Sequence, residues 1–131
     1  MPTRPLSPHL SVYRMSRYTL VTSIANRFTG VALSAGLPLL VYWLMAVAGG
    51  AQSYARATRV LTSPLARLIY AALIVSFCYH LVAGLRHLVW DTGHGLERAQ
   101  SQKSAWLVIA VSIVLMLLIA CRFWLIGGHS P

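Results

Sequence analysis

The chain has 131 residues, of which 57% are hydrophobic and only 10% are charged. Soluble domains carry about 25% charged residues, so the composition excludes an ordinary soluble globular protein. The formal net charge of +9 is distributed between long apolar runs rather than along one stripe. This distribution favours a membrane protein with basic loops over a nucleic-acid-binding domain.

The first twenty residues are polar and contain three prolines and three arginines. Prolines at this density argue against a long helix. The segment also lacks the short apolar core and the small-residue cleavage site of a secretory signal peptide. We therefore expect a short N-terminal segment outside the membrane. The start at Met1 without a presequence favours a bacterial over a mitochondrial protein.

Three apolar runs predict three membrane helices, over about residues 24–48, 65–91 and 104–125. Each run is long enough to cross the roughly 30 Å hydrocarbon core of a bilayer. Pro38 predicts a kink in the first helix. We expect a loop after the first helix and a short polar link after the second. The predicted fold is all-α, an integral membrane three-helix bundle that forms a single domain over residues 1–131.

Basic residues predict how this bundle is oriented. Three crossings place the N-terminal segment and the second link at the same membrane face. That face has seven basic residues and the opposite face has four: Arg4, Arg14, Arg17, Arg27, Arg86, Arg98 and Lys103 against Arg56, Arg59, Arg67 and Arg122. The positive-inside rule therefore predicts that the N-terminus and the end of the second helix lie at the cytoplasmic or matrix face.

His80 lies deep inside the second apolar run, and no charged residue precedes it back to Arg67. An ionisable side chain within a membrane indicates a functional site, and imidazole is the commonest metal ligand among side chains. Gly84, one helical turn later, leaves a gap on the same helix face, which favours a haem beside His80. The alternative is that His80 only makes a helix–helix hydrogen bond.

The sequence offers only one histidine for such an iron. His87 is seven residues further on, about 10.5 Å along the helix axis, so it cannot share an iron with His80. No other predicted span contains a histidine. The iron is then either five-coordinate or bound by a second histidine from a different chain. Arg27, Arg86 and His87 are predicted to lie at the face toward which haem propionates would point.

Two further groups at that face suit quinone chemistry. Ser23 and Arg27 are an i, i+4 pair at the start of the first span, where a hydroxyl and a guanidinium suit hydrogen bonding to a quinone carbonyl. The alternative is a basic anchor with a helix-start serine. Asp91, one of only two acids, suits a proton relay. The alternative is that Asp91 is a solvated or salt-bridged helix end.

Two sequence patterns resemble a known family. The run His80-x-x-x-Gly84-x-Arg86-His87-x-x-x-Asp91-x-Gly93 resembles the haem-helix signature of the succinate dehydrogenase cytochrome b subunits, the larger membrane anchors of respiratory complex II. The runs Arg4-Pro5-Leu6-Ser7-Pro8-His9-Leu10 and Ser23-Ile24-Ala25-Asn26-Arg27-Phe28-Thr29-Gly30 are similar to that family's second signature. The resemblance covers nearly the whole chain.

The resemblance implies a membrane-anchor subunit of a succinate:quinone oxidoreductase. Such a subunit pairs with a second small membrane anchor and shares a haem b with it, one axial histidine coming from each. Here that histidine, the metal ligand, is His80. An iron–sulfur subunit and a flavoprotein subunit complete the complex, so the dicarboxylate-oxidising site is on another chain. Ubiquinone is reduced near the cytoplasmic or matrix face, and the bacterial inner membrane is the implied location.

The resemblance also implies roles for individual residues. Ser23 and Arg27 map to the quinone-binding serine and arginine, and Asp91 maps to an acid linked to proton supply. Asn26, Arg27 and His87 map to the propionate end of the haem. The family usually has histidine where this chain has Asn26, and an amide can donate a hydrogen bond but cannot become cationic. The propionate end is therefore expected to depend more on Arg27 and His87.

Two other classes of function stay open from the residues alone. One is a haem-free structural anchor, in which His80 only packs between helices. The other is a small helical-bundle transporter, which is less well supported because no acidic residue lies in mid-membrane to couple ions.

Overall fold

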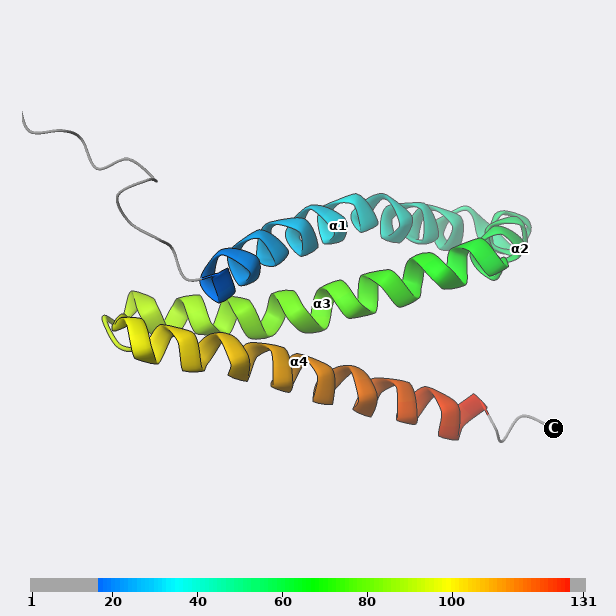
Figure 1. Ribbon diagram of the computed structural model, residues 1–131. Coiled ribbons are helices and arrows are strands. Elements are labelled where there is room, and N and C mark those ends of the chain that lie inside the picture. Colours follow the sequence, from blue (N-terminus) through cyan, green and yellow to red (C-terminus); the bar gives the residue numbers. More distant parts are fainter. Residues whose placement is uncertain (1–16, 128–131) are drawn as a thin grey trace, which may run out of the picture.

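A computed structural model describes residues 17–127, so most of the predicted N-terminal segment lies outside the described residues. Four helices follow one another: α1 (Arg17–Ala48), α2 (Gly50–Leu61), α3 (Pro64–Asp91) and α4 (Arg98–Gly127). Figure 1 shows α1, α3 and α4 running side by side, with the short α2 joining α1 to α3 at one end. Within the described part, α1, α3 and α4 are long and apolar enough to cross a membrane. The predicted all-α membrane bundle is confirmed.

The first and third membrane helices begin earlier than predicted. α1 begins at Arg17 and α4 at Arg98. The thickness of the membrane determines the length of the apolar run, but the helix can continue beyond that run. Polar residues such as arginine, glutamine and lysine are good helix formers and extend a helix beyond the hydrocarbon core. Pro38 lies inside α1 without interrupting it, and Figure 1 shows α1 arching along its length.

The prediction of a loop after the first helix is wrong, because α2 is a twelve-residue helix over Gly50–Leu61. Gly50 has a φ of 81°, a conformation that favours glycine, and it makes the turn out of α1. The alanines and arginines that follow have high helix propensity, and Ala57 is buried. Arg56 and Arg59 are therefore carried on a short helix at the α1–α3 connection.

The bounds of α3 follow from local signals. The side chain of Ser63 accepts a hydrogen bond from the backbone N–H of Ala66 at 3.3 Å, and Pro64 occupies the first turn, where proline is favoured. The helix ends at Asp91, and Gly93 and Gly95 follow with φ values of 81° and 77°. This glycine turn lies in the polar link predicted after the second helix, and it brings α4 back alongside α3.

Small side chains form most of the packed interior of the bundle. The buried residues are Thr22, Ala46, Ala57, Ala66, Ser76, Cys78, Ala83, Ala105, Val108 and Ser112. Small residues allow membrane helices to approach closely. Many large apolar side chains, such as Phe28 at 72% exposure, point away from the bundle. Apolar surface on this scale is covered by lipid or by partner subunits.

Candidate functional site

His80 lies between α3 and α1, and its ring is held by the backbone of α1. Its Nδ1 is 3.1 Å from the backbone oxygen of Asn26 and 3.3 Å from Oγ1 of Thr29. A carbonyl oxygen can only accept, and the Thr29 hydroxyl lies within donating distance of the carbonyls of Ala25 and Asn26, at 2.9 and 3.0 Å. Nδ1 therefore carries the hydrogen, and the free lone pair of the ring is on Nε2.

Gly30 allows α1 to approach the imidazole closely. A Cβ at this position would lie 3.0 Å from Cε1 of His80, which is shorter than the 3.5–4.0 Å of an ordinary contact between carbon atoms. The absence of a side chain therefore lets the Asn26 carbonyl reach Nδ1. A hydrogen bond from the non-ligating ring nitrogen to a carbonyl is a common way to orient a metal-ligating histidine.

The surroundings of His80 fit a haem. A Cβ at Gly84 would meet no described atom within 4 Å, so the gap expected beside His80 is not filled by the described part of this chain. Oδ1 of Asn26 is buried and has no hydrogen-bond partner within residues 17–127. The described residues hold no cluster of three or more His, Cys, Asp or Glu side chains. Among the described residues, His80 is thus an oriented imidazole without a complete set of metal ligands around it.

The other predicted site residues lie at one end of the bundle. Figure 1 shows that the start of α1 and the end of α3 lie at the same end. At the start of α1, Ser23 is half-buried and Arg27 is exposed, and Asp91 is exposed at the end of α3. The side chains of Arg27 and Asp91 form no hydrogen bond or ion pair with a described residue. The structure therefore brings these side chains to one region without joining them directly.

His87 lies on the same end of α3 as Asp91 but is exposed. Its ring packs edge-on against the ring of Trp90, with the centroids 5.2 Å apart and the planes at 83°. His87 and His80 are separated by seven residues of unbroken helix, which corresponds to about 10.5 Å. The two imidazoles therefore occupy different depths, as the sequence predicted.

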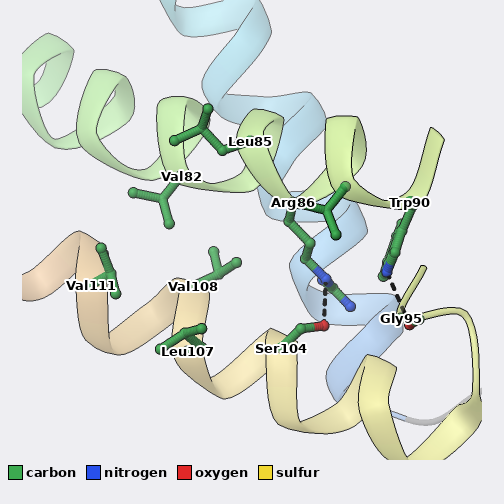
Figure 2. Close-up of a pocket in the computed structure, with 10 residues that line it drawn as sticks. Val82, Leu85, Arg86, Trp90, Gly95, Ser104, Leu107, Val108 and Val111 are labelled. Atoms are coloured by element: carbon green, nitrogen blue, oxygen red, sulfur yellow. Dashed lines mark hydrogen bonds between the residues drawn. The ribbon is translucent and has the colours of Figure 1, made fainter. Parts of the chain in front are cut away.

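Arg86 ties three helices together, a role that the sequence did not reveal. Its Nε and NH2 groups donate to Oγ of Ser104 at 2.9 Å and to the backbone oxygen of Ser101 at 2.9 Å. NH2 also lies 3.2 Å from Oγ of Ser101, and NH1 lies 3.4 Å from Oγ1 of Thr22. The guanidinium stacks 4.0 Å above the ring of Trp90. Figure 2 shows it turned toward α4.

A second polar contact joins α3 to α1. The hydroxyl of Tyr79 donates to the backbone oxygen of Thr22 at 2.9 Å.

The sequence gives only a weak signal for the contacts of Arg86. Two serines three residues apart in α4, Ser101 and Ser104, indicate that hydroxyls of this helix meet a polar partner. The direction in which Arg86 points depends on how α3 is rotated against α4. That rotation cannot be read from α3 alone.

The fold and the site together define a class of protein. The chain is an integral membrane subunit that holds one imidazole in a ligand-ready tautomer and gathers hydroxyl, guanidinium and carboxylate groups at one end of the bundle. This arrangement defines a helical membrane protein with a candidate metal-ligating histidine within an apolar helix.

Comparison with known proteins identifies the family. The family model described as "Succinate dehydrogenase/Fumarate reductase transmembrane subunit" matches residues 1–119. The chain is 45% identical to the "Succinate dehydrogenase cytochrome b556 subunit" of Paracoccus denitrificans, over 92% of each chain. It is 34% identical to the protein of the same name from Rickettsia prowazekii, over 88% of this chain and 90% of that protein. It is 36% identical to the human mitochondrial cytochrome b560 subunit, over 85% of this chain and 66% of that protein.

The chain therefore belongs to the succinate dehydrogenase/fumarate reductase transmembrane subunit family. It is a membrane-anchor subunit of a succinate dehydrogenase complex, as the two sequence patterns predicted. Its enzymatic role is that of one subunit within a larger oxidoreductase.

Proposed function

We propose that Nε2 of His80 supplies one axial ligand to a haem b that lies between this chain and a second small membrane-anchor subunit. The observation that carries this proposal is the hydrogen bond from Nδ1 to the Asn26 carbonyl, because it fixes the tautomer and leaves Nε2 free. The names of the relatives as cytochrome b subunits support a haem. When bound, haem b supplies a one-electron redox centre inside the membrane.

The second axial ligand comes from the partner subunit in this proposal. Within the described helices, His80 is the only histidine away from a helix end.

Asn26, Arg27 and His87 lie toward the haem propionates. The exposed guanidinium of Arg27 favours this role, because it is a donor and its side chain bonds to no described residue. From Asn26 only the amide nitrogen can donate to a propionate, because its buried Oδ1 can only accept.

Ubiquinone reduction is proposed at the end of the bundle that holds Ser23, Arg27 and Asp91. The Ser23 hydroxyl and the Arg27 guanidinium donate hydrogen bonds to a quinone carbonyl oxygen, and these bonds strengthen as the oxygen gains negative charge. Asp91, which is exposed, relays protons from water to the reduced oxygen. The exposed guanidinium of Arg27 and the shared location of the three side chains support the assignment.

The remaining partners follow from the same assignment. An iron–sulfur subunit and a flavoprotein subunit oxidise succinate and deliver electrons at the quinone end. The excess of basic residues at that end, seven against four, supports a cytoplasmic N-terminus. The similarity to bacterial subunits supports a location in the bacterial inner membrane.

The His80→Ala variant in the whole complex tests the central claim. We expect the haem band to disappear from the reduced-minus-oxidised spectrum while the subunits still co-purify. His94→Ala is the matched control, because His94 is exposed in the turn after α3 and bonds only to Thr92 among the described residues. A normal haem band in His80→Ala refutes the ligand assignment. A wild-type complex without any haem band favours the haem-free anchor instead.

A further inference from the structure

An apolar groove of about 280 Å³ runs along the seam between α3 and α4. One polar cluster, formed by Arg86, Trp90, Gly95 and Ser104, closes one end of the groove. Aliphatic side chains line the rest of it: Val82, Leu85 and Val89 from α3, and Leu107, Val108 and Val111 from α4. In Figure 2, Val82 of α3 lies across from Val108 of α4, and the polar cluster lies at one end.

The groove is separate from the proposed haem site. Val89 is nine residues from His80, and at about 100° per residue this places it half a turn around α3. The groove therefore lies on the face of α3 opposite His80. Leu85, Val89 and Leu107 are 54%, 53% and 62% exposed, so the groove opens away from the packed interior of this chain.

The polar end of the groove carries an uncompensated positive charge. Arg86 contacts only hydroxyls, a backbone oxygen and the Trp90 ring. It forms no ion pair within the described part of the chain. A partly buried cation without an anion is costly in apolar surroundings. One N–H of NH1 is also left without a partner among the described residues, because guanidinium has five donors.

We propose that this groove binds one anionic phospholipid. An acyl chain lies between the aliphatic rows of α3 and α4, and the phosphate accepts from Arg86 at the polar end. Trp90 lies eight residues after Val82, which corresponds to about 12 Å along the axis and is enough to hold part of one acyl chain. Arginine binds phosphate well through its planar fork of donors. A phosphate neutralises Arg86, whereas a neutral quinone leaves the charge uncompensated.

Filling the groove with tryptophan tests the proposal without removing Arg86. Val89→Trp occupies the groove from its rim. Leu88→Trp is the matched control, because Leu88 is 62% exposed on the same helix and does not line the groove. The whole complex, purified with its partner subunits and delipidated, is incubated with dioleoyl phosphatidylglycerol or dioleoyl phosphatidylcholine. Native mass spectrometry then counts the retained lipids.

We expect the wild-type complex and Leu88→Trp to retain one more phosphatidylglycerol than Val89→Trp, and no corresponding phosphatidylcholine. Leu107→Trp fills the groove from α4 and is expected to lose the same lipid, while Leu118→Trp, 62% exposed on α4, retains it. Equal retention in filled and control variants overturns the proposal. Equal retention of the two lipids also overturns it. So does loss of ubiquinone or of a partner subunit in place of the phospholipid.

Discussion

Gly30→Ala tests the hydrogen bond that orients His80. The added methyl group would lie 3.0 Å from Cε1 and 3.6 Å from Nδ1 of His80. An ordinary carbon–carbon contact is about 3.5 Å or more, so the ring must retreat from α1 by about 0.5 Å. The distance from Nδ1 to the Asn26 oxygen, now 3.1 Å, then reaches about 3.6 Å, which is too long for a hydrogen bond.

We expect Gly30→Ala to lower the affinity for haem strongly and to change the free energy of unfolding little. Losing one neutral hydrogen bond costs about 1 kcal/mol, but replacing a helical glycine by alanine recovers about 0.8–1 kcal/mol. The two effects nearly cancel in the free energy of unfolding. Loss of a hydrogen bond to a ligating histidine, in contrast, lowers metal affinity by about 10–100-fold.

The assay measures haem content and haem dissociation in the purified complex, together with its thermal unfolding. Gly36→Ala is the matched control, because its added methyl meets the flexible end of Leu73, at 2.7 Å, on the same helix but away from His80. We expect Gly36→Ala to keep the full haem content. A Gly30→Ala complex that binds haem with wild-type affinity would refute the role assigned to the Nδ1 hydrogen bond.

Three other substitutions separate the proposed roles. Arg27→Leu is expected to lower the rate of ubiquinone reduction about 10–100-fold, because a charge-assisted hydrogen bond contributes about 1.5–3 kcal/mol. Succinate oxidation with an artificial acceptor is expected to persist. Equal loss of both activities would indicate an assembly defect. Arg86→Gln is expected to lower the free energy of unfolding by about 2–4 kcal/mol, because the bonds to α1 and α4 are lost; unchanged denaturant unfolding would exclude a clamping role. Asn26→His is expected to keep the haem and to raise its reduction potential as the pH falls, because imidazole becomes cationic; a redox titration that does not respond to pH would contradict this.

The sequence determined the membrane class and was enough to select His80 as the candidate ligand. Apolar runs of about twenty residues are sufficient to predict membrane helices, because membrane thickness fixes the length that must be apolar. An ionisable imidazole is energetically costly within a membrane and usually indicates a functional site. The position of His80 within an apolar run was therefore enough to select it. The turn after Asp91 was also predictable, because Gly93 and Gly95 supply its positive φ values.

Tertiary structure alone decided which groups meet. The sequence placed His80 and Asn26 on different helices, but only the close approach of α1 at Gly30 brings the Asn26 carbonyl to Nδ1. Arg86 lies at the end of the bundle where the sequence placed it, and the rotation of α3 against α4 turns its guanidinium to Ser101 and Ser104. Side-chain partners depend on the relative rotation and crossing of helices, which local sequence does not encode. The tautomer of His80 therefore follows from the packing of α1 against α3, whereas its depth in the membrane follows from the apolar run alone.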